Sequence, residues 1–208
     1  MFELSKEETS ILKSLSTPNK IQDFLDTLAF NYEKSGETCM SPRRVLREGK
    51  AHCLEGALFA ATALWLHGER PLLLNLETLD DDDDHALALY KKNGLWGALS
   101  KTNHNVLRFR DPVYHTVHEL VLSYFHEYFM PGTGQKTLRA YSRPFSLKQF
   151  GTAWIISEEN LWTIAHALDE APHSPIVPKD YTRHLRPASL VEQTSASIAE
   201  WDKKNPRT

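Results

Sequence analysis

The sequence predicts an α+β fold, in which helices come first and a cluster of strands follows. Before residue 70, apolar residues recur at intervals of three and four, which is typical of amphipathic helices. Residues 72–99 instead contain short apolar runs with turn residues on both sides, which indicate buried strands. No repeat or flexible linker divides the 208 residues, so we expect a single domain over 1–208.

The composition is that of an ordinary globular protein. Hydrophobic residues make up 41% of the chain and charged residues 25%, and the formal net charge of −3 argues against a nucleic-acid binder that relies on a basic surface. The apolar runs fall short of the roughly 18 residues that a membrane span needs, and the N-terminus lacks a signal-peptide pattern. Two cysteines are too few for a disulfide framework. We therefore expect a cytoplasmic protein with no membrane or nucleic-acid partner.

The first 35 residues predict a helical extension. Apolar residues between Leu4 and Leu15 recur at helical spacing, and Thr17 followed by a proline can cap a second helix. This second helix carries the apolar stripe from Ile21 to Leu28. Between residues 33 and 49 the pattern fades, which indicates a loop with a short helical piece.

The strongest helical pattern in the chain runs from His52 to His67, and Gly68 ends it. Apolar runs that begin after Pro71 then predict strands, and Asn93-Gly94 predicts a hairpin turn between the last two. The predicted strands are Leu72–Leu76, His85–Tyr90 and Leu95–Leu99.

Later elements are less regular. The expected helices there are 112–128 and about 158–168, and the expected strands are about 138–141 and 154–156. From about residue 172 the chain is rich in proline, serine and lysine, so we expect an irregular tail on the surface.

Cys53 is expected in the first turn of the strongest helix. Unpaired N–H groups and the helix dipole stabilise a thiolate there, and the same N–H groups can hold the oxyanion of a tetrahedral intermediate. A nucleophilic cysteine also needs a base and an orienting group. The alternative is that Cys53 is a small buried apolar residue, as free cysteines often are.

The order of motifs around Cys53 favours the catalytic interpretation. The motifs are Gly49-Lys50-Ala51-His52-Cys53 at the helix start, Leu64-Trp65-Leu66-His67-Gly68-Glu69-Arg70-Pro71 at its end, His85 at the start of a strand, and Gly94-Leu95-Trp96 in the next strand. This order resembles the transglutaminase-like superfamily of papain-type cysteine enzymes, from Gly49 to about Asn103. Glu55, two residues after the cysteine, is also similar to the arylamine N-acetyltransferase branch.

The resemblance implies a papain-like, transglutaminase-like core at about residues 40–125, in which the helix carrying Cys53 packs on an antiparallel sheet. It also implies that His85 deprotonates Cys53, and that the thiolate attacks an amide or thioester carbonyl to form an acyl-enzyme. Release of the acyl group to water gives a peptidase or amidase, and release to an amine gives an acyltransferase. The substrate would be a peptide, a protein or a small acyl compound, and no cofactor is implied.

The third catalytic residue departs from the family pattern. The family usually has an aspartate four residues after the tryptophan, where this chain has Ser100. Serine can accept a hydrogen bond from His85 but cannot supply a negative charge. Papain-like enzymes use asparagine in this role, so either Ser100 or Asn103 is expected to orient His85. The residues expected to contact the substrate are Trp96, Glu55 and His52.

Several alternatives accompany this hypothesis. The absent aspartate leaves open a non-catalytic relative that binds a peptide or protein partner in the same cleft. Cys39 offers a third interpretation, as the resolving thiol of a redox pair with Cys53. The aspartate run Asp80–Asp84 lacks the spacing of a calcium loop, so a solvated loop is expected and no metal is predicted.

Overall fold

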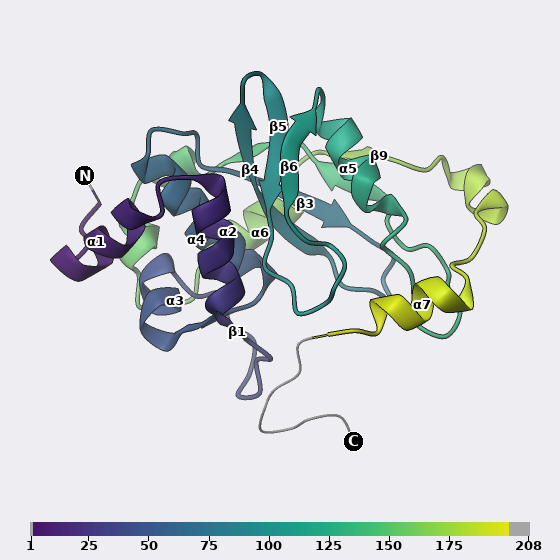
Figure 1. Cartoon of the computed structure of the whole chain (residues 1–208), viewed down its shortest axis with the longest axis horizontal. Helices are drawn as coiled ribbons and strands as arrows, with labels where there is room; N and C mark the ends of the chain where they lie inside the picture. Colours follow the sequence, from purple (N-terminus) through teal and green to yellow (C-terminus); the bar gives the residue numbers. More distant parts are fainter. Residues whose placement is uncertain (1, 200–208) are drawn as a thin grey trace.

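The computed structural model describes residues 2–199 and has the predicted α+β architecture, with helices around a mostly antiparallel sheet (Figure 1). The helices are α1 (Lys6–Ser14), α2 (Pro18–Thr27), α3 (Pro42–Glu48), α4 (Cys53–Leu66), α5 (Val117–Phe125), α6 (Trp162–Asp169) and α7 (Leu190–Ala196), with 3₁₀ turns η1 (Leu147–Phe150), η2 (Ala153–Ile156) and η3 (Lys179–His184). The strands are β1 (Ala29–Phe30), β2 (Lys50–Ala51), β3 (Leu72–Glu77), β4 (His85–Lys92), β5 (Leu95–Leu99), β6 (Arg110–Tyr114), β7 (Ala140–Ser142), β8 (Phe145–Ser146) and β9 (His173–Pro175).

The main sheet has the strand order β6-β5-β4-β3-β7-β9, and β8 also pairs with β3. At its centre β3 and β4 are antiparallel, with His85 opposite Leu76. The predicted hairpin joins β4 to β5, and its turn residues Asn93 and Gly94 both have positive φ, as a tight hairpin turn requires. A separate parallel pair joins β1 to β2, and β2 ends two residues before Cys53.

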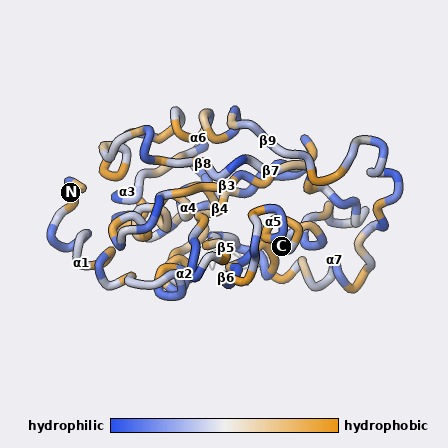
Figure 2. The backbone as a smooth tube through the Cα atoms, turned by 90° about the horizontal axis from the view of Figure 1, so that it is seen from above, coloured by the Kyte–Doolittle hydropathy of each residue, from blue (hydrophilic) through white to orange (hydrophobic). Residues whose placement is uncertain are grey.

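The sheet is buried on both faces, which explains why its central strands read as continuous apolar runs. Alternate residues of a strand point to opposite faces. Leu73 and Ala86 accordingly belong to an apolar cluster with α1–α4 and α6, while Leu74 and Leu87 belong to a second cluster with α5. In Figure 2, β3 and β4 run through the middle of the molecule, with α6 on one side and α5 on the other.

Helix α4 lies at the centre of the first cluster. Ten consecutive residues from Glu55 to Leu64 are buried, because α4 packs on β4 and is surrounded by α1, α2 and α3. His52 is its N-cap, and Gly68, just beyond its C-terminus, has φ of 91°. The predicted central helix and the three predicted strands after it are therefore present in the structure.

Two sequence predictions in the C-terminal half are wrong. Residues 112–114 belong to strand β6, and α5 begins only at Val117, because Thr116 caps it in a reciprocal pair with Glu119. A proline is tolerated at Pro112 because β6 is an edge strand. Residues 154–156, expected as a strand, lie in the 3₁₀ turn η2, where Trp154 and Ile155 fill the core beside α3.

The C-terminal segment is more ordered than the predicted irregular tail. Its first part forms β9, which extends the main sheet by pairing with β7, and its last described part forms α7. Helix α6 begins at Trp162, later than expected from the sequence. Within residues 2–199, no helix has both the length and the hydropathy needed to cross a membrane.

Candidate active site

Cys53 is the first residue of α4 and lies at a cavity of about 780 Å³. Its side chain is neither fully buried nor fully exposed. The cavity size is in the range of sites that bind small molecules or peptide side chains. The lining residues that concern the chemistry are His52, Cys53, Asp82, Asp83, Asp84, His85, Asn103 and Tyr128.

His85 reaches Cys53 because it is the first residue of β4, the strand on which α4 packs. Its side chain is only 6% exposed. The Nε2 atom of His85 lies 2.8 Å from the Oγ atom of Ser100, which directly follows β5. The hairpin between β4 and β5 thus places the side chains of His85 and Ser100 side by side.

The hydrogen bonds of Ser100 define the tautomer of His85. The Ser100 hydroxyl donates to the Leu107 carbonyl at 2.5 Å, so its oxygen accepts a hydrogen from Nε2 of His85. Nδ1 then remains as the ring nitrogen available to Cys53. Gln22 of α2 fixes the Ser100 backbone by bonding both its N–H and its carbonyl, at 3.0 and 2.8 Å.

His52 is a second imidazole beside the thiol. Its Nδ1 accepts a long hydrogen bond of 3.3 Å from the Leu54 N–H, and its Nε2 lies 3.0 Å from the Thr38 carbonyl oxygen. The Oε1 atoms of Glu55 and Glu33 lie 3.4 and 3.9 Å from the same Nε2. The ring is therefore held from both sides while it lines the cavity next to Cys53.

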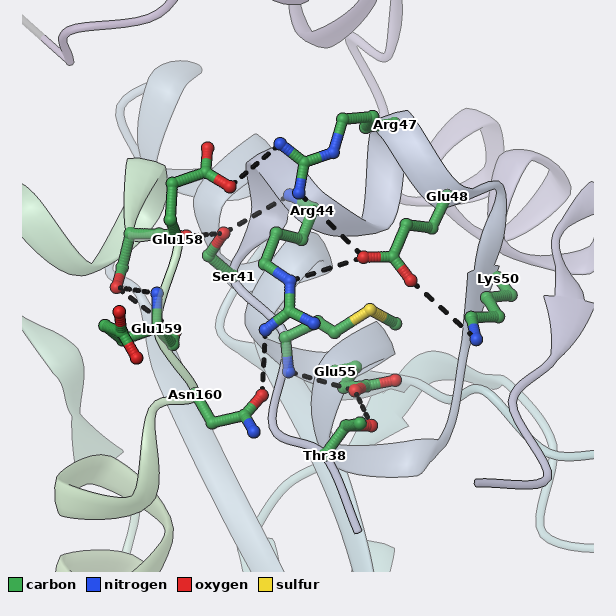
Figure 3. Close-up of polar contacts among 12 residues, drawn as sticks. Thr38, Ser41, Arg44, Arg47, Glu48, Lys50, Glu55, Glu158, Glu159 and Asn160 are labelled. Atoms are coloured by element: carbon green, nitrogen blue, oxygen red, sulfur yellow. Dashed lines mark hydrogen bonds and ion pairs between the residues drawn. The ribbon is translucent and has the colours of Figure 1, made fainter. Parts of the chain in front are cut away.

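Glu55 is completely buried beneath the site. Its two carboxylate oxygens accept hydrogen bonds from the Thr38 hydroxyl, the Met40 N–H, the Asn31 amide and the His52 N–H, at 2.8 to 3.1 Å. The contact with Thr38 is visible in Figure 3. Glu55 thus ties the segment from Asn31 to Met40 to the start of α4.

The same segment is also anchored to the C-terminal half of the chain. The Asn160 side-chain oxygen accepts hydrogen bonds from the Cys39 N–H at 3.2 Å and from Arg44 of α3 at 2.8 Å. Arg44 also contacts Glu48 at 3.3 Å, and Figure 3 shows these side chains converging between α3 and the segment before α6. The carbonyl of Cys39 completes the connection by accepting from the Leu161 N–H.

The two imidazoles govern the ionisation of Cys53. Burial alone raises the pKa of the thiol, but hydrogen bonds with His52 and His85 and the positive charge of their protonated forms lower it to about 5. Burial opposes the imidazolium of His52, yet its hydrogen bond to Cys53 and the charges of Cys53 and Glu55 raise its pKa to about 9. Cys39 differs, because burial raises the pKa of its thiol to about 12.

The structure separates the residues that were expected to contact a substrate. His52 lines the cavity, whereas Glu55 is buried beneath it and has no exposed surface with which to contact a ligand. Trp96 lies on β5 among the residues around the second apolar cluster, with the Lys91 ammonium 4.8 Å from its ring centre. Of the two candidates to orient His85, Ser100 makes the hydrogen bond, and Asn103 lies in the cavity wall.

The aspartate run forms part of the cavity wall through Asp82, Asp83 and Asp84. Its carboxylates are used locally: Asp84 accepts from the Thr78 N–H at 2.8 Å, and Asp82 from the Thr137 hydroxyl at 2.5 Å. Among the described residues, no group of three or more histidine, cysteine or acidic side chains is arranged to hold a metal ion.

Three features of the site were not predicted from the sequence. These are the direct contact of His52 with the thiol, the support of Ser100 by Gln22, and a buried Tyr128 whose hydroxyl has no hydrogen-bond partner among the described residues. A histidine next to the cysteine is a local signal that could have indicated the first. The other two depend on contacts between residues far apart in the chain. No protein-family model matches this sequence, and no curated protein matches it significantly.

Proposed function

We propose that this chain is a thiol enzyme of transglutaminase-like type, in which Cys53 attacks an amide or thioester carbonyl with His85 as the base. The observation that carries the proposal is the combination of a thiol at a helix N-terminus with an imidazole that is oriented by the hydrogen bond it donates to Ser100. A structural cysteine needs neither a lowered pKa nor an oriented base.

The arrangement supports a two-step acyl transfer. The Cys53 thiolate attacks the carbonyl carbon, and the carbonyl oxygen becomes an oxyanion near the N–H groups of the first turn of α4. The intermediate collapses to a thioester on Cys53, and the leaving group departs with the proton that the thiol gave up. His85 then removes a proton from water or an amine as it attacks the thioester, and the thiol is regenerated.

The papain-like core is also part of the proposal. It is supported by α4 packing on β4 of an antiparallel sheet, with Cys53 at the helix start and His85 at the strand start. Ser100, at the end of β5, has the position in which the resemblance implies an aspartate. The most plausible substrates are peptide or protein amides and small acyl compounds.

A binding module without catalysis is the second candidate, and one observation favours it. Ser100 is a neutral hydrogen-bonding partner for His85, so it supplies no charge to stabilise an imidazolium there. The cavity would then bind a peptide or protein partner. A binding cleft, however, has no need of a thiol whose pKa is lowered to about 5.

Acyl-enzyme formation tests the proposal. The full chain would be incubated with an activated acyl ester, an acyl thioester and a peptide amide, and acylated peptides would be located by mass spectrometry. We expect acylation of Cys53 in the wild type and in Cys39→Ala, and none at this position in Cys53→Ser. Equal acylation of Cys53 and Cys39, or none with any donor, would favour the binding module.

A further inference from the structure

The proposed function leaves one chemical question, namely what stabilises the charge formed when Cys53 loses its proton. In the arrangement with His85, the orienting group is Ser100, which is neutral. Two carboxylates approach the other imidazole beside the thiol, that of His52. Glu55 and Glu33 approach Nε2 of His52 at 3.4 and 3.9 Å.

The surroundings of His52 suit a positively charged ring. Its Nε2 faces three oxygen atoms, one from the Thr38 carbonyl and one each from the carboxylates of Glu55 and Glu33. With both acids ionised, none of these oxygens carries a hydrogen, so each can accept a hydrogen bond but not donate one. Nε2 therefore carries a hydrogen in either charge state of the ring. Nδ1 is therefore the nitrogen that gains or loses a proton, and it is the nitrogen left for the hydrogen bond between the side chains of His52 and Cys53.

Glu55 is well placed to hold this ring in position. Because its oxygens accept four hydrogen bonds from donors of the surrounding chain, its position is fixed by Asn31, Thr38, Met40 and the His52 backbone. The Glu55 carboxylate therefore accepts a hydrogen bond from the backbone N–H of His52, the N-cap residue, and also faces the His52 side chain. A buried carboxylate attracts an imidazolium more strongly than an exposed one, because little water lies between them.

We propose that His52, positioned by Glu55, is the imidazolium partner of the Cys53 thiolate, and that His85 acts as the base for the water or amine that attacks the thioester. This inference rests on the proposed function and assigns a second histidine to it. The S–H bond of Cys53 breaks and an N–H bond forms at Nδ1 of His52. On acylation the leaving group takes up this proton, and His52 returns to the neutral state. On deacylation His85 takes a proton from the attacking water or amine and passes it to the released Cys53 sulfur, which can then protonate His52 again.

The change at His52 also involves its capping role. In the neutral ring, Nδ1 accepts the 3.3 Å hydrogen bond from the Leu54 N–H. Protonation of Nδ1 removes this acceptor and puts an ion pair with the neighbouring thiolate in its place. The bond that is lost is long and therefore weak, so the exchange favours the ion pair.

Alkylation of Cys53 by iodoacetamide between pH 4 and 10 separates the roles of the two histidines. The variants are His52→Asn, in which asparagine can still cap α4, and His85→Asn. Circular dichroism and thermal melting would verify that each variant is folded. In the wild type we expect half-maximal alkylation near pH 5. His85 also lowers the pKa of the thiol, so in His85→Asn we expect the midpoint to rise, but by less than in His52→Asn, because the His52 partner remains. In His52→Asn the midpoint moves toward the ordinary thiol pKa of about 8.5, and alkylation at pH 6 slows roughly 10- to 100-fold.

Glu55 and Thr38 provide the matched pair for the positioning role. Glu55→Gln keeps the shape of the side chain but removes its charge, and we expect the Cys53 midpoint to rise. Thr38→Val removes the hydrogen bonds of the hydroxyl with Glu55, Glu33 and Asn31 but keeps both carboxylates and the Thr38 carbonyl. Thr38→Val should therefore leave the pH midpoint of Cys53 alkylation unchanged. If the cluster had only a structural role, Thr38→Val and Glu55→Gln would shift this midpoint to a similar extent.

Two outcomes would overturn the inference, and they differ from failure of the proposed function. If His85→Asn raises the midpoint while His52→Asn keeps it near pH 5, His85 is the partner of the thiolate. An unchanged midpoint in Glu55→Gln would contradict the role of its charge. Neither outcome affects acyl-enzyme formation on Cys53, whereas the absence of that adduct would contradict the proposed function alone.

Discussion

The Nε2 atom of His85 lies 2.8 Å from the Oγ atom of Ser100, where β4 begins and β5 has just ended. Because the Ser100 hydroxyl is committed to the Leu107 carbonyl, the serine oxygen can only accept from His85. Ser100 therefore fixes the orientation and tautomer of His85 but supplies no charge to stabilise an imidazolium. This relationship distinguishes the site from one in which an aspartate performs both tasks.

Replacing Ser100 with alanine should slow acylation of Cys53 by at least about 10-fold, because His85 loses the bond that orients it. Single-turnover acylation with an activated ester would measure the rate. Asn103→Ala is the matched control, since Asn103 lines the same cavity while Ser100 makes the hydrogen bond. A larger loss in Asn103→Ala than in Ser100→Ala would assign the orienting role to the asparagine.

Gln22→Leu should lower the free energy of unfolding by about 2–4 kcal/mol. The substitution leaves the N–H and the carbonyl of Ser100 without partners in the interior, and each unsatisfied group costs about 1–3 kcal/mol. Urea unfolding would measure the change. Gln149→Leu removes a hydrogen bond at an exposed position and should change stability by less than about 0.5 kcal/mol. Similar effects of the two changes would contradict the supporting role of Gln22.

Tyr128 and Tyr124 should respond in opposite ways to replacement by phenylalanine. The Tyr128 hydroxyl is buried without a partner among the described residues, so Tyr128→Phe should leave stability unchanged or raise it. The Tyr124 hydroxyl donates to the Arg108 carbonyl at 3.0 Å, so Tyr124→Phe should cost about 1 kcal/mol. Thermal unfolding compares the two. A marked loss in Tyr128→Phe would show that its hydroxyl has a partner.

Gly56→Ala should destabilise the protein although alanine favours helices. A Cβ atom at Gly56 would lie 2.4 Å from the Cβ of Lys101, so α4 or the segment after β5 must shift. Overpacking of this kind costs about 1–3 kcal/mol, which exceeds the gain of about 1 kcal/mol in helix propensity. The measurement is the free energy of unfolding, and an increase would contradict the close approach of the two segments.

The order of the main elements could be predicted because it rests on local periodicity. The apolar patterns before residue 70 and in 72–99 predicted α4 and the strands β3, β4 and β5. The errors lie where local and tertiary preferences compete. Residues 112–114 directly precede the apolar pattern of α5 but belong to β6, which pairs with β5 through Arg110 and Tyr114. The apolar Trp154 and Ile155 fill the core from a 3₁₀ turn.

The site was predictable to a similar extent. Cys53 could be singled out from its place at the helix start, whereas His85, and Ser100 or Asn103 as its orienting residue, followed from the resemblance to the transglutaminase-like superfamily. The structure brings the side chains of Cys53, His85 and Ser100 together. The position of Gln22 could not be predicted, because 78 residues separate it from Ser100. The burial of Glu55 was also missed, since an acid in the first turn of a helix is usually an exposed cap.

The pH dependence of Cys53 alkylation in the wild type tests the central claim most directly, with Cys39 as the reference in the same digest. The thiolate is the reactive form, so a lowered pKa shifts the rise in rate to lower pH. We predict a half-maximal rate near pH 5 for Cys53, and negligible labelling of buried Cys39, whose thiol has a pKa of about 12. A rate for Cys53 that rises only near pH 8.5 would contradict the account, because no activated thiolate would then be present.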